Sequence, residues 1–61
     1  MWTVIYIAPN EKIAERISEK LTTEGFLVKT RQTAISKQFE ILVPESELDE
    51  IQEVLNSIIH P

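Results

Sequence analysis

The opening stretch MWTVIYIAPN constrains the fold of this chain more than any other. Side chains of a β-strand alternate between the two faces of its sheet, so a strand with one solvated face alternates apolar and polar residues. Here the run from Trp2 to Ala8 is apolar on both faces. We expect two rows of side chains: Trp2, Val4, Tyr6 and Ala8 on one face, and Thr3, Ile5 and Ile7 on the other. Such a strand needs cover above and below, and the rest of the chain can supply only two helices.

The chain has 61 residues and no cysteine. This length allows one domain, which we place over residues 1–61. A domain of this size buries only about 60% of the surface that its unfolded chain exposes, so a monomer would be marginally stable. Disulfides and cysteine-based metal sites are excluded by composition. Tight packing or association with a second chain must therefore supply the stability.

Charge and hydropathy restrict the partners. A net charge of −4 argues against binding to nucleic acid or to an anionic membrane, because affinity there rests on excess Lys and Arg. No stretch approaches the ~20 apolar residues that cross a bilayer. The apolar run at the start lacks a preceding basic region and is too short for a signal peptide. We expect a soluble, cytoplasmic protein with no nucleic-acid and no membrane partner.

A helix follows the first strand. Pro9 ends the strand and holds Ala8 extended, and Asn10 is a suitable N-cap. Residues 11–25 show the apolar spacing of an amphipathic helix. Gly25 stands where a helix end commonly requires a left-handed residue.

The remaining residues predict two strands and a second helix. Residues 26–32 and 38–43 are the strands, joined by a hairpin connection at Thr33 to Lys37. Pro44 ends the third strand. Ser46 is the expected N-cap of a last helix that runs to about Ile59.

This order predicts an α+β fold. A right-handed crossover links the first two strands. If the third strand pairs with both, the sheet is antiparallel with order 1-3-2, and both helices cover one face. The expected core is Ile5, Ile7, Phe26, Val28, Phe39, Ile41 and Val43 against Ile13, Ile17, Leu21, Ile51, Leu55 and Ile58. The expected far face is Trp2, Val4, Tyr6, Leu27 and Leu42 with Lys29, Arg31 and Glu40.

The arrangement resembles a ferredoxin-like domain that stops before its fourth strand, which would leave the outer edge of the first strand vacant. Within that class, the residues VIYIAPNEKIAE, EGFLV and EILVPESELDEIQEVL resemble a family of short bacterial signal-transducing proteins of unknown function. The resemblance covers nearly the whole chain, through Ala8-Pro9-Asn10 and Val43-Pro44-Glu45. It implies a βαββα fold like that of PII-type regulators, whose connection between the second and third strands contacts the regulated partner.

Three cations are the candidate ligand site. Lys29 and Arg31 would share the far face of the sheet with Lys37 at the hairpin, so the three could hold a phosphate or a carboxylate. The alternative is cross-strand pairing with Glu40.

The candidate dimer interface is the apolar part of the far face: Trp2, Val4, Tyr6, Leu27 and Leu42. An apolar surface of this kind is typical of an interaction site. The outer edge of the first strand is the other candidate surface, because open apolar edges recruit partners.

Other charged residues indicate no chemistry. The basic stripe Lys12, Arg16 and Lys20 is interleaved with glutamates and is interpreted as a solvated helix face. His60 lies next to the chain end, without neighbours to hold it in a geometry for catalysis. We expect no catalytic residue, no metal site and no cofactor. The preferred hypothesis is a non-catalytic homodimeric module that could also bind another protein; a sensor of a small anionic effector is second, and an enzyme third.

Overall fold

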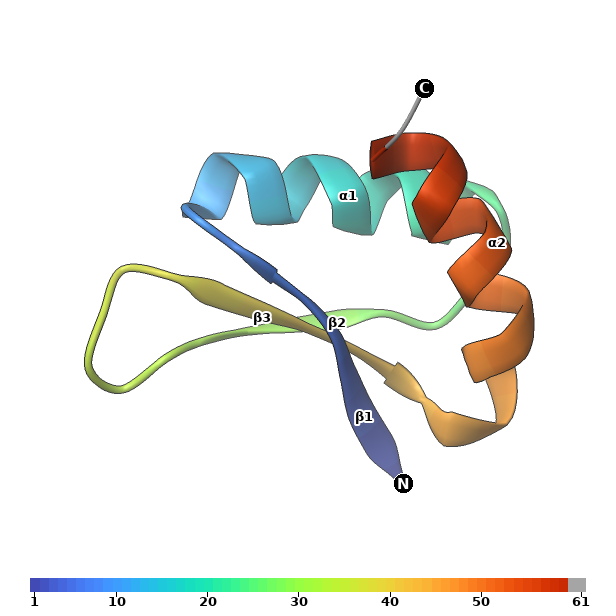
Figure 1. The fold of residues 1–61 in the computed structure, drawn as a ribbon, viewed down its shortest axis with the longest axis horizontal. Helices are drawn as coiled ribbons and strands as arrows, with labels where there is room; N and C mark the ends of the chain where they lie inside the picture. Colours follow the sequence, from blue (N-terminus) through green and yellow to red (C-terminus); the bar gives the residue numbers. More distant parts are fainter. Residues whose placement is uncertain (60–61) are drawn as a thin grey trace.

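A computed structural model of the chain describes residues 1–59 and shows a three-stranded sheet with two helices on one face (Figure 1). The elements, in order, are β1 (Trp2–Ala8), α1 (Glu11–Thr23), β2 (Lys29–Gln32), β3 (Phe39–Pro44), the 3₁₀ turn η1 (Glu45–Glu47) and α2 (Leu48–Ile59). The strand order is β1-β3-β2, and β3 pairs antiparallel with both neighbours. The predicted α+β architecture and sheet order are confirmed.

Local chemistry sets both ends of α1. The side chain of Asn10 accepts a hydrogen bond from the Ile13 amide at 3.0 Å, which satisfies one free donor of the first turn. At the other end, Gly25 has φ +94°. The Gly25 amide donates to the Thr22 carbonyl (2.9 Å) and the Phe26 amide to the Leu21 carbonyl (3.1 Å), the pair of bonds that defines a Schellman motif. The predicted helix ends are therefore confirmed.

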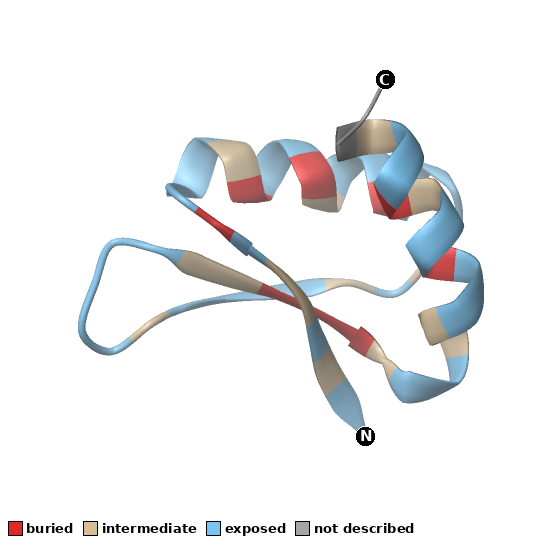
Figure 2. Ribbon diagram, in the orientation of Figure 1, coloured by how far each residue is buried: buried red, intermediate tan, exposed pale blue. Residues whose placement is uncertain are grey.

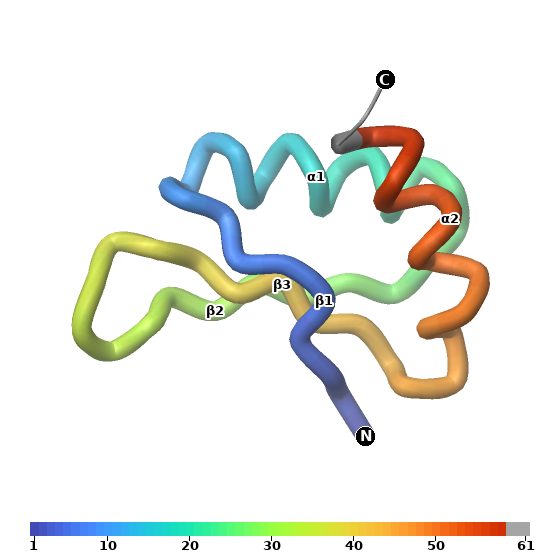
Figure 3. The backbone as a smooth tube through the Cα atoms, in the orientation of Figure 1, coloured from blue at the N-terminus to red at the C-terminus, as the bar shows by residue number. Residues whose placement is uncertain are grey.

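The strands differ from the prediction at their ends. β2 pairs with β3 only from Lys29 onward, because Phe26 is still bound to the end of α1 through its amide. Pro44 is the last residue of β3 rather than the residue that follows it. The β2–β3 loop extends away from both helices (Figure 3) and is closed by the Thr33 amide, which donates to the Gln38 carbonyl at 3.0 Å.

The last helix begins differently from the prediction. Pro44 stands at the cap position of η1, and no side chain caps that turn. Ser46 lies inside η1 and α2 starts at Leu48, so the predicted Ser46 cap is wrong. A tight turn after Pro44 continues directly into the helix, and this leaves no extended residue for Ser46 to occupy as a cap.

An extra residue in β1 changes which side chains reach the core. The pairing of β1 with β3 shifts between Val4 and Tyr6, so Ile5 is a β-bulge residue. Beyond the bulge, Tyr6 lies opposite Ile41 and Ile7 opposite Glu40. Directly opposed residues share a face, so Tyr6 packs against the core and Ile7 is 49% exposed. The predicted core position of Ile7 and the predicted far-face position of Tyr6 are both wrong.

The core lies between the sheet and the two helices (Figure 2). Its buried residues are Ala8, Ala14, Ile17, Leu21, Ile41, Val43, Ile51 and Leu55. Ile5, Phe26, Val28, Phe39, Ile13 and Ile58 are partly buried against it, as predicted. Both helices are amphipathic. Each packs its apolar side against the sheet and leaves its polar side exposed to solvent.

We predict that Gly25→Ala lowers the free energy of unfolding by about 1–2 kcal/mol, the cost of a left-handed L-residue. A Cβ at Gly25 would meet nothing within 4 Å, so the loss would come from backbone conformation alone. Urea unfolding followed by circular dichroism measures it. Gly25→Asn is the control and should lose less, because asparagine tolerates this conformation. Equal stability of all three proteins would contradict the assignment.

Candidate functional site

The side of the sheet opposite the helices, here called the open face, carries several exposed large apolar side chains. The pairing register places Trp2, Val4, Ile7, Lys29, Arg31, Glu40 and Leu42 on this side, and Leu27 lies in the segment just before β2. The exposed fractions are 41% for Trp2, 40% for Val4 and 64% for Leu27. Of the predicted interface residues, these three are accessible, and Ile7 joins them where Tyr6 was expected.

Leu42 lies on the open face but is only 4% exposed. In the sheet register it is flanked by Val4 on β1 and Lys29 on β2. The ammonium group of Lys29 lies 4.9 Å from the centroid of the Trp2 ring, a cation–π contact that joins the two edge strands across β3. We infer that these side chains cover Leu42, so this predicted interface residue belongs to the packed structure of the monomer.

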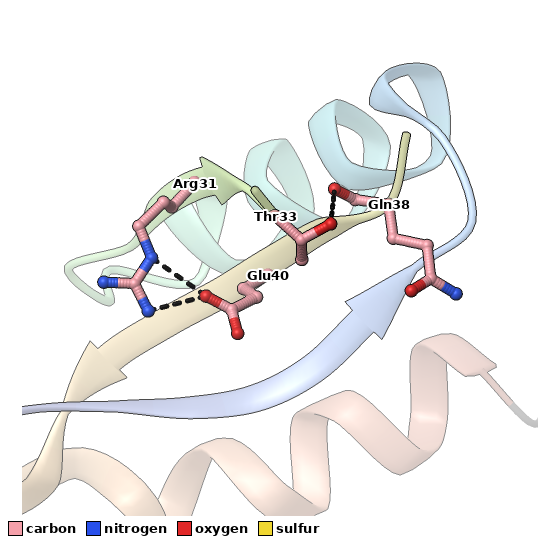
Figure 4. A network of polar contacts seen from close by, with 4 residues as sticks. All are labelled: Arg31, Thr33, Gln38 and Glu40. Carbon is pink, nitrogen blue, oxygen red and sulfur yellow. Dashed lines mark hydrogen bonds and ion pairs between the residues drawn. The ribbon is translucent and has the colours of Figure 1, made fainter. Parts of the chain in front are cut away.

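The predicted cation cluster is already engaged in part. Arg31 donates from Nε (2.9 Å) and Nη2 (2.6 Å) to the same Glu40 carboxylate oxygen, directly across the β2–β3 ladder (Figure 4). This is the cross-strand alternative that the sequence left open. Lys29 faces Trp2, and Lys37 lies in the β2–β3 loop. The three cations therefore lie in different environments.

The loop that carries Lys37 has its own polar network. The Thr33 hydroxyl lies 2.6 Å from the Ser36 hydroxyl. It also donates to the Gln38 carbonyl at 3.3 Å (Figure 4). Ile35 is 97% exposed within this loop. Neither feature follows from turn chemistry that can be recognised in the sequence, because the loop lacks Gly, Asn and Pro.

A groove between α1, α2 and β1 was not predicted. It has a volume of about 670 Å³ and is lined by Tyr6, Ile13, Arg16, Ile17, Lys20, Glu24, Val54, Ser57 and Ile58. Its lining is mostly apolar, and Arg16 and Lys20 stand beside it on α1. Over residues 1–59, the one ion pair is Arg31–Glu40, so neither groove cation has a carboxylate within 4.0 Å. In the sequence, this groove is indicated only by the helical spacing of Ile13, Arg16 and Lys20, which puts them on one side of α1.

In the described part of the chain, no group of three or more His, Cys, Asp and Glu side chains is placed to hold a metal ion. Neither of its helices has the length and apolar character required to cross a membrane. His60 lies outside the described residues.

Comparison of the chain with protein families, with curated proteins and with solved structures found no match. The resemblance to bacterial signal-transducing proteins therefore stays a prediction. Functional proposals for this chain rest on its own surfaces.

The two predicted interface leucines should respond differently to truncation. We expect Leu42→Ala to lower the free energy of unfolding by about 2–4 kcal/mol, since it removes a buried side chain from the middle of the sheet. Leu27→Ala is the matched control and should change it by less than about 0.5 kcal/mol, as is usual for exposed positions. Urea unfolding at low protein concentration makes the comparison. Equal losses would show that Leu42 is not covered in the monomer.

Proposed function

We propose that this chain is a non-catalytic interaction module that associates as a homodimer through its open face. The observation that carries the proposal is the grouping of exposed Trp2, Val4 and Ile7 on the side of the sheet that no helix covers. Contiguous apolar surface of this kind typically marks an interaction site. Aromatic residues such as Trp2 are enriched among the anchors of such interfaces.

A second copy is the occupant that fits the charges of this face. Arg31 and Glu40 lie side by side on it, so a two-fold axis can place each Arg31 near the Glu40 of the other copy. The Arg31 side chain is 61% exposed and keeps donors for such a contact. Two sheets packed face to face lie about 10 Å apart, a distance that apolar side chains fill.

The size of the face predicts a weak dimer. Three strands at about 4.8 Å spacing, with a rise of about 3.3 Å per residue, give a face of only a few hundred Å². A standard interface buries about 800 Å² on each partner, which would be a large share of the 4500 Å² surface of this chain. We therefore expect reversible association in the micromolar range or weaker.

A sensor of a small anionic effector remains the second proposal, with Lys29, Arg31 and Lys37 as its ligands. It has less support, because an effector must compete with Glu40 for Arg31 and with the Trp2 ring for Lys29. Exposed ion pairs contribute only about 0.2–1 kcal/mol, so such competition is feasible. An enzymatic function is not proposed.

The dimer proposal predicts that Val4→Lys and Ile7→Lys each shift the chain toward monomer by tenfold or more in the dissociation constant, about 1.4 kcal/mol. Each change places a charge among the exposed apolar side chains of the open face. Sedimentation equilibrium over a wide concentration range measures the effect, and Trp2 fluorescence on dilution reports whether that ring becomes exposed.

Ile35→Lys is the matched control, because Ile35 is also exposed but lies in the β2–β3 loop. It should leave the dissociation constant unchanged. A wild-type chain that stays monomeric up to millimolar concentration would rule out the homodimer. An equal rise of the dissociation constant in Ile35→Lys would show that the interface is not confined to the open face.

The effector proposal predicts a rise in melting temperature with phosphate, nucleotides or acidic metabolites. The rise should disappear in Lys29→Ala with Arg31→Ala, since both cations are then missing. Absence of any shift in the wild-type chain would refute the proposal.

A further inference from the structure

We infer that the free edge of β1 and the neighbouring groove together form a docking site for an extended peptide of another protein. The peptide would pair with β1 through its backbone, place apolar side chains in the groove, and present one acidic side chain to Arg16 and Lys20. Two independent features support this site: an unpaired strand edge and a groove whose lining suits the side chains of an added strand.

One edge of β1 has no partner strand among residues 1–59. In the order β1-β3-β2, β1 pairs with β3 alone. In the view of Figure 1, β1 passes in front of the other two strands, so its free edge faces the reader, with α1 and α2 above the sheet. Alternate backbone N–H and C=O groups of an edge strand point outward, and extended peptides bind such edges by adding a strand.

The bulge limits how much of the edge can pair. Ile5 interrupts the regular ladder, and Pro9 follows the end of β1. Regular backbone remains from Tyr6 to Ala8, and Tyr6 is also a lining residue of the groove. The edge that can add a strand is therefore the part that adjoins the groove. A short addition of this kind needs side-chain contacts to reach useful affinity.

The groove supplies those contacts. Its apolar lining comes from three elements: Tyr6 of β1, Ile13 and Ile17 of α1, and Val54 and Ile58 of α2. In an added strand, every second side chain points to the helix side of the sheet, where this lining lies. A volume of about 670 Å³ is ample for a few side chains. Because β1 is both edge and lining, backbone pairing and side-chain burial can occur together.

The charged residues that border the groove favour a peptide with one acidic side chain. Arg16 and Lys20 are one turn apart on α1, and both border the groove without an ion-pair partner among residues 1–59. Glu24 follows one turn later on the same border. An acidic side chain on the peptide is therefore favoured at the Arg16–Lys20 end and disfavoured at the Glu24 end. This asymmetry would also orient the peptide along the groove.

This site is separate from the proposed dimer surface. The groove lies on the helix side of the sheet, whereas Val4 and Ile7 lie on the open face. The monomeric Val4→Lys protein should therefore retain peptide binding.

The test uses the whole chain labelled with ¹⁵N and three capped synthetic peptides. In the first, valine and threonine alternate and glutamate replaces one valine. The second has lysine in place of the glutamate, and the third is the first peptide with N-methyl groups on alternate amides of its pairing edge. We expect the first peptide to shift the Tyr6, Ile7 and Ala8 amide signals and slow their hydrogen exchange. The second should bind about tenfold more weakly, and the third should not bind, because it cannot pair with β1.

Arg16→Glu with Lys20→Glu should reverse the preference between the glutamate and lysine peptides. Lys12→Glu with Lys37→Glu changes the net charge equally at positions that do not line this groove, and should keep the original preference. Binding of the N-methylated peptide, or no binding of the glutamate peptide at millimolar concentration, would overturn the proposal. Exchange protection of Tyr6–Ala8 that rises with protein concentration alone would also overturn it, because a second copy would then occupy the edge.

Discussion

Pairing of β3 on both sides is the interaction on which the rest of the structure depends. β1 and β2 do not pair with each other, so the sheet exists only because β3 joins them. Ile41 and Val43 of β3 are fully buried against the helices, and Leu42 is nearly buried on the other face. We infer that the Lys29–Trp2 contact between the edge strands helps to cover Leu42. A short sheet can thus have a central strand protected on both faces although helices cover only one.

The bulge in β1 determines how the apolar residues of this strand are divided between the two faces. Without it, Tyr6 would share a face with Trp2 and Val4, and Ile7 would point to the core. Because of the extra residue, the side chains that follow Ile5 lie on the opposite faces, with Tyr6 on the core side and Ile7 on the open face. Tyr6 consequently lines the groove, while Ile7 extends the apolar surface of the open face. Both proposed interaction surfaces therefore depend on one irregular residue, and a bulge in an edge strand also limits pairing with other chains.

The two surfaces suggest a division of roles within one small domain. The open face has mixed charges that suit a second copy of the chain, whereas the groove has cations on α1 that suit an acidic partner. A dimer through the open face would leave one groove and one strand edge on each copy. The proposed dimer would then have two peptide-binding sites. A partner that carries two such peptides could bind both sites at once, and its overall affinity would exceed that of either single site.

Local residue chemistry by itself determined the element order, the Asn10 and Gly25 helix ends, and the apolar seams of both helices, because each depends on near neighbours in the chain. The sequence predicts the sheet order on the condition that β3 pairs with both other strands, and it offers the Arg31–Glu40 pair as an alternative to ligand binding. Three features were decided only by the tertiary structure. They are the face of the sheet on which each β1 side chain lies, the burial of Leu42, and the groove beside Arg16. A bulge shifts every later side chain to the other face without a mark in the composition. Burial and grooves arise from segments far apart in sequence, such as β1 and α2, whose contact no local pattern specifies.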